Sequence, residues 1–179
     1  MGTTKKPSTI KTNPGDSVWD RVRKFVQAAI LENARIYRGL LEATGQLSVG
    51  MAFQRLANRI NDIPEDIRKT GIDGISGLEA NSDGVFYFEY KGVGRRVPFR
   101  EDSGWRTGYI KVPDGVESDI YALRDIEKQL NEDKEILEQR AFVVDRVIPA
   151  IGHLELRVAD ERARIVERLR RDDILPIGC

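Results

Sequence analysis

The residues whose chemistry is easiest to recognise in this sequence are few and scattered. His153 is the only histidine, and no cysteine lies near it. A metal site needs several ligands at a defined spacing, so this lone histidine is better interpreted as a polar residue of a helix. No zinc spacing, phosphate-binding loop, dinucleotide glycine motif or Gly-x-Ser-x-Gly elbow occurs. The sequence therefore predicts no metal, no cofactor and no catalytic triad.

A second candidate is a group of acids near a lysine. Asp83 precedes Glu89-Tyr90-Lys91, an order that faintly resembles the acid and Glu-x-Lys of metal-dependent nucleases, where carboxylates hold Mg²⁺. The match is poor, because Asp83 lies very close to Glu89 in sequence and Lys91 falls in an expected turn. We therefore predict that the protein is not an enzyme.

Aromatic and basic residues are concentrated between Phe86 and Lys111. Aromatic platforms flanked by cations are typical of proteins that bind single-stranded nucleic acid. The ordinary alternative is that Phe86, Phe88 and Phe99 belong to the core, with the arginines solvated beside acids. The residues left as a candidate ligand or nucleic-acid surface are Tyr87, Arg95, Arg96, Arg100, Trp105 and Arg106.

The composition is that of a water-soluble folded chain. Of 179 residues, 40% are hydrophobic and 32% charged, and the 29 basic residues balance the 29 acidic ones. A whole-protein field that attracts nucleic acid or a membrane is therefore not expected. No apolar run reaches the length of a membrane-spanning helix, and the first residues lack a signal-peptide pattern. We expect a cytoplasmic protein that does not enter a membrane.

Three helices are predicted in the first part of the chain. Ser17 and Asp20 form a capping box, and apolar residues then recur with helical period as far as Gly45. A second helix is expected at about residues 47–61 and a short third one between Pro64 and Gly71. The glycine- and asparagine-rich stretch between Gly71 and Asp83 is interpreted as a loop.

A β-hairpin is the clearest strand signal. Residues 85–90 and 95–100 are rich in β-formers, and Gly92 as the first central residue of a two-residue turn would give the type II′ geometry. A third strand at residues 109–112 would complete a small antiparallel meander, and Pro98 argues for a free edge on the second hairpin strand. That turn predicts three opposed pairs: Phe88 with Val97, Phe86 with Phe99, and Glu89 with Arg96.

The last third of the chain is long amphipathic helix. Every seventh residue is apolar along one line, which we call the seam: Leu123, Leu130, Leu137, Val144, Ile151, Val158 and Ile165. The companion line is weaker, because Asp133, Arg140 and Glu161 interrupt it, and a two-stranded coiled coil needs both lines apolar. We expect a helical bundle or loose coiled coil, with these three charges near solvent.

Pro149 falls inside this helical run. Proline in a helix removes one hydrogen bond and clashes with the preceding turn. Either the helix kinks there or the chain reverses into a helical hairpin. The seam keeps its phase across Pro149, which favours a kinked or briefly broken helix. A straight helix of this length would be about 80 Å long, so a partner subunit or the first helix must cover its apolar side.

These patterns predict an α+β protein with N-terminal helices, a small antiparallel β-meander and a long C-terminal helical arm. The expected division is a flexible tail at residues 1–16, a globular part at 17–115, a helical arm at 116–173 and a tail at 174–179. Within the globular part, helices occupy 17–70 and the meander 84–112.

The expected function is a non-catalytic adaptor or structural protein that oligomerises, or docks on a protein partner, through the seam. One alternative is a nucleic-acid-binding accessory factor that uses the basic aromatic hairpin. A second is an inhibitor or immunity-type protein that sequesters one protein partner.

Overall fold

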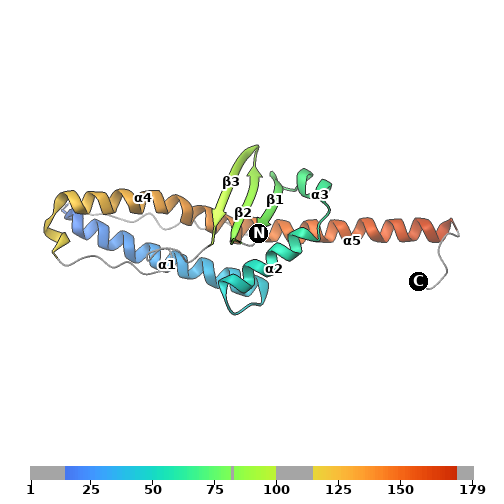
Figure 1. The fold of residues 1–179 in the computed structure, drawn as a ribbon, viewed down its shortest axis with the longest axis horizontal. Helices are drawn as coiled ribbons and strands as arrows, with labels where there is room; N and C mark the ends of the chain where they lie inside the picture. The colour runs from blue at the N-terminus through green and yellow to red at the C-terminus, as the bar shows by residue number, and fades with distance from the viewer. Residues whose placement is uncertain (1–14, 82, 100–114, 173–179) are drawn as a thin grey trace.

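The computed structural model describes residues 15–81, 83–99 and 115–172, and it confirms the α+β class (Figure 1). The predicted tails at 1–16 and 174–179 fall almost wholly outside the described residues. The elements, in chain order, are α1 (Val18–Thr44), α2 (Val49–Asn61), α3 (Glu65–Thr70), β1 (Ile75–Asn81), β2 (Val85–Tyr90), β3 (Val93–Pro98), η2 (Val116–Ser118), α4 (Ile120–Phe142), η3 (Val143–Val147) and α5 (Ile148–Arg171).

The first three helices form where the sequence predicts them. α1 begins with the expected capping box: the Asp20 amide donates to the Ser17 hydroxyl at 3.1 Å, and the Ser17 amide donates to the Asp20 carboxylate at 3.3 Å. Such a cap stabilises a helix by about 1 kcal/mol. α2 begins at a second serine cap, where the Ser48 hydroxyl accepts from the Met51 amide.

The sheet is antiparallel with strand order β1-β2-β3, and β1 corrects the sequence analysis. The sequence pattern predicts a loop at residues 75–81, and the structure has a strand there. Gly77 takes a positive φ, and a bulge lies between Ser76 and Glu79. The bulge breaks the two-residue alternation that would have revealed the strand. The strand predicted at residues 109–112 lies outside the described residues.

The hairpin forms at the predicted place, but its predicted pairing is wrong. Phe86 pairs with Val97, Phe88 with Arg95 and Glu89 with Gly94. The turn residues are Lys91 and Gly92, both with positive φ, which is the type I′ turn. Moving the turn by one residue shifts each partner by two, so every side chain stays on its expected face. Pro98 lies on β3, an edge strand of the described sheet, as predicted.

The C-terminal helix runs on without a reversal from α4 into α5, as the phase of the seam favours (Figure 1). Between them, η3 is a π-helical segment, and the Ile148 amide donates to the Val143 carbonyl five residues back. Pro149 follows at once. The wider π turn gives room to the proline ring, which in a regular helix would meet the preceding carbonyl.

The helix α1 covers the seam along most of its length. α1 and α4 lie side by side and start at the same end of the molecule (Figure 1). Their ion pairs follow a parallel register, with Arg21 beside Glu127 at 3.8 Å and Arg35 beside Asp145 at 3.4 Å. The approach is closest at Gly39, where an added Cβ would lie 2.8 Å from a Val144 methyl.

Two of the three charges that interrupt the companion line are buried, contrary to expectation. Asp133 is 5% exposed and Arg140 is fully buried, whereas Glu161 is exposed. The Arg140 guanidinium donates to the Pro98 carbonyl at 2.7 Å, to Asn33 Oδ1 at 3.4 Å and to the Tyr37 hydroxyl at 3.2 Å. A buried charge needs such partners. Arg140 therefore links α1, α4 and the edge of the sheet.

Within the described residues, none of the helices combines the length and apolar character needed to cross a membrane.

Candidate functional site

The seam residues divide into a covered group and one exposed residue. Leu123, Leu130, Leu137, Ile151 and Val158 are buried within the chain, and Val144 is partly buried against the same core. Their immediate role is to hold α4 and α5 against α1 and the sheet. Ile165, by contrast, is 55% exposed. The seam is therefore exposed to solvent at its end and covered before it.

The last turns of α5 extend beyond the rest of the fold (Figure 1). We call residues 159–171 the overhang; all of them are exposed except Leu169, which is intermediate. Ile165 and Leu169 continue the core-facing line of Val158. Beside them runs a second line of small and apolar side chains at spacings of three and four, the helical period. It starts at Leu156, just before the overhang, and continues through Ala159, Ala163 and Val166.

The opposite half of the overhang is charged. At 3.6 residues per turn most of the remaining positions gather on one side, while Arg162 and Arg170 lie among the apolar positions. Arg157 and Glu161 form an ion pair at 3.6 Å there, with both side chains about half exposed, so its contribution to stability is small. The charged residues of this half are Arg157, Asp160, Glu161, Arg164, Glu167, Arg168 and Arg171. The overhang is therefore an amphipathic helix whose apolar half is not covered by any described element.

Just before the overhang, an ion pair fixes α5 to the body. The Arg59 side chain of α2 donates from Nε to both carboxylate oxygens of Glu155, at 3.2 and 3.1 Å. These hydrogen bonds raise the pKa of Arg59, despite a counteracting effect of burial. Two-pronged pairs of this kind fix orientation as well as distance. The direction in which the overhang leaves the body is thus set by a defined contact.

The candidate ligand surface on the hairpin is brought together only in part. Tyr87 pairs with Arg96 across the strands and with Glu79 on β1, so these three side chains share the outer face of the sheet. Arg95 pairs with Phe88 and therefore lies on the opposite face. Three further candidates lie outside the described residues: Arg100, Trp105 and Arg106.

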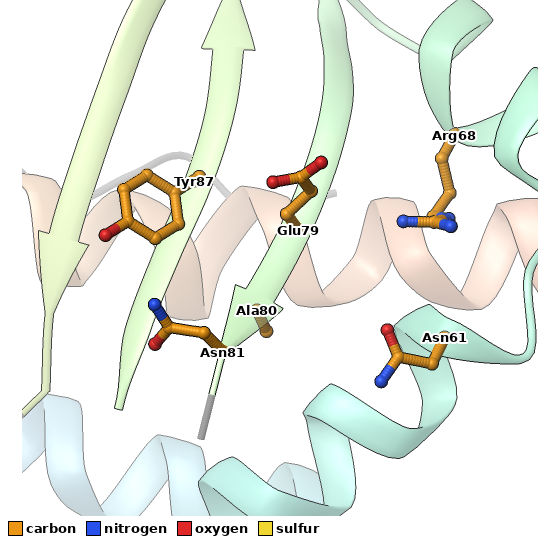
Figure 2. Close-up of a pocket in the computed structure, with 6 residues that line it drawn as sticks. All are labelled: Asn61, Arg68, Glu79, Ala80, Asn81 and Tyr87. Carbon is orange, nitrogen blue, oxygen red and sulfur yellow. The ribbon is translucent and has the colours of Figure 1, made fainter. Parts of the chain in front are cut away.

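A small polar pocket lies at the end of this outer face (Figure 2). It has a volume of about 250 Å³ and takes residues from α2, α3, β1 and β2. Arg68 donates to the carbonyls of Ile63 and Leu78, at 3.0 and 3.3 Å, so it also ties α3 to its neighbours. The lining residues are Asn61, Arg68, Glu79, Ala80, Asn81 and Tyr87.

The chemistry open to this pocket is hydrogen bonding and ion pairing with a small polar ligand. Of the described residues that line it, none is a histidine, serine or cysteine. The pocket is not predicted from the sequence, because it depends on β1, where the sequence pattern predicts a loop. The alternation of Ile75, Leu78 and Ala80 around Gly77 was the available signal, and the bulge obscured it.

The residues examined first for catalysis are not brought together. Asp83 and Lys91 lie at opposite ends of β2, and the Lys91 ammonium lies over the Tyr90 ring at 5.3 Å. His153 is exposed on α5. Across the part of the chain that the structure describes, no cluster of three or more histidine, cysteine or acidic side chains is arranged to hold a metal ion.

Comparisons with protein-family models, with curated proteins and with solved structures give no match for this chain.

Proposed function

We propose that this is a non-catalytic protein-interaction or assembly protein that docks through the overhang of α5. The observation that carries the proposal is the exposed apolar half of the overhang, where Ile165 is 55% and Val166 37% exposed. The overhang lacks the tertiary packing that stabilises the rest of α5. Its apolar stripe is the kind of surface that partner helices and hydrophobic grooves bind.

The location of this surface differs from the one expected from the sequence. Most of the seam stabilises the fold of the single chain, and docking is assigned to its last residue, Ile165, and to the neighbouring apolar line. An inhibitor or immunity-type protein would use the same surface, because both functions require one helical face that fits one partner. The nucleic-acid alternative has weaker support, since Glu79 and Glu89 share the outer face of the sheet with Arg96.

The test is a capture experiment with two adjacent substitutions in the overhang. Tagged wild-type protein, Ile165→Glu and Arg164→Glu are expressed in the native cell, cross-linked, purified and identified by mass spectrometry. Both variants introduce one carboxylate, but Ile165 lies on the apolar half and Arg164 on the charged half. We expect Ile165→Glu to lose the captured protein, whether another species or a second copy, and Arg164→Glu to keep it. Equal capture by all three proteins would refute the proposal.

A further inference from the structure

The charged residues beside the exposed end of the seam are self-complementary when two copies of the helix lie antiparallel. Glu161 and Arg168 lie on the same flank of Ile165, seven residues apart, with the acid first and the base second. In an antiparallel pair of identical helices, this flank faces the same flank of the partner with its order reversed. Each Glu161 then lies beside the partner's Arg168, and each Arg168 beside the partner's Glu161.

We propose that the apolar half of the overhang is covered by the overhang of a second copy of this chain, packed antiparallel. The proposal rests on the function proposed above and names the partner. The pairing is centred between Ala163 and Arg164. Ile165 then packs beside the aliphatic stem of the partner's Arg162, whose guanidinium extends to solvent. Ala159 lies beside the partner's Val166 on the other flank.

A parallel arrangement of the same helices is disfavoured by charge. Arg162 lies on the core-facing side of the helix, between Val158 and Ile165 and about one turn from each. In a parallel pair, it would lie beside the partner's Arg162 at the centre of the contact. In the antiparallel pair, the two arginines are separated and the flanking acids and bases are opposed. Interfaces with two-fold symmetry need this self-complementarity.

The shape of the molecule accommodates such a pair. α5 projects past α2 and α3, so the second chain can lie along the overhang with its own body at the far end (Figure 1). The Arg59–Glu155 pair holds the helix in this projecting direction. The contact is short, about 20 Å at 1.5 Å per residue. It therefore buries little area, and we expect a weak, concentration-dependent dimer with a dissociation constant of roughly micromolar or higher.

The experiment is sedimentation equilibrium of the full chain over roughly a hundredfold range of concentration, for the wild type and three charge variants. The variants are Glu161→Arg, Arg168→Glu and the double exchange of both. Each single exchange places like charges side by side twice in the dimer, and we expect about a tenfold weaker association. The double exchange restores the opposite charges, and association should return to the wild-type value.

Rescue by the double exchange is specific for the antiparallel contact. Residues seven positions apart on one helix are about 10 Å apart along its axis and do not pair within the chain. Circular dichroism of each variant establishes that the helix is retained. A wild-type chain that stays monomeric throughout, or single exchanges without effect, or a double exchange without recovery, would each overturn the inference.

The capture experiment separates this failure from failure of the proposed function. If Ile165→Glu loses a different protein while the wild-type chain is monomeric, the second copy is wrong and docking through the overhang is supported. If Ile165→Glu changes neither capture nor association, both proposals fail.

Discussion

The inner and outer parts of α5 continue the same apolar spacing but have opposite surroundings. Ile151 and Ile165 lie on the same seam, two seven-residue repeats apart, yet Ile151 is fully buried and Ile165 is 55% exposed. Around Ile151, α5 contacts the core formed with α1, α2 and the sheet. Around Ile165, no described element lies close. A regular apolar spacing thus shows that a helix has a face to cover, and it does not show what covers it.

The strongest test of this comparison removes the same side-chain atoms from Ile151 and from Ile165. Ile151→Ala leaves a cavity in a packed core and should lower the free energy of unfolding by about 4 kcal/mol. Ile165→Ala removes atoms that are largely in water and should change it by less than about 0.5 kcal/mol. Urea denaturation at low protein concentration measures both values. Similar losses at the two positions would mean that the overhang is packed against the chain itself.

The polar interruptions of the companion line offer a second test. Arg140→Gln removes a buried guanidinium and leaves carbonyl and amide partners unsatisfied, so we expect a loss of about 3 kcal/mol. Glu161→Gln, three repeats further along the line, should alter stability by less than about 0.5 kcal/mol, because Glu161 is exposed and its ion pair is weak. The same denaturation assay applies. Stability retained in Arg140→Gln would show that the buried network is dispensable.

The smallest expected effects on stability are those of alanine substitutions at two glycines inside helices. Gly39→Ala should destabilise the protein by about 1 kcal/mol, because the new methyl meets a stiff Val144 side chain and this outweighs the gain in helix propensity. Gly152→Ala meets nothing within 4 Å and should stabilise the protein by up to about 1 kcal/mol. The opposite signs, measured as shifts in thermal midpoint, are the result to look for.

Local patterns predicted most of the helical structure. Ser17 and Asp20 placed the start of α1, because a capping box satisfies amides within one turn. The phase of the seam correctly favoured a kinked or briefly broken helix over a reversal at Pro149. The hairpin was placed correctly, but its turn was assigned to Gly92 and Val93 instead of Lys91 and Gly92. A glycine tolerates either position, and the sequence offers no further preference between them.

The features that could not be predicted depend on contacts between residues far apart in the sequence. The bulge at Gly77 obscures the strand pattern of β1 in the sequence. The strand is recognised from its pairing with β2, which exists only in the folded chain. Arg140 was expected near solvent because a charge is costly to bury. Its partners come from α1 and β3, far away in the sequence, and they compensate that cost.

By itself, the sequence determined the α+β class, the helix caps and the existence of one long apolar helical face, because these depend on residues within a few turns of each other. Only the tertiary structure decided that α1, α2 and the sheet cover this face as far as Val158 and leave Ile165 open. Whether a face is buried depends on which distant segments fold against it, and on where those segments end.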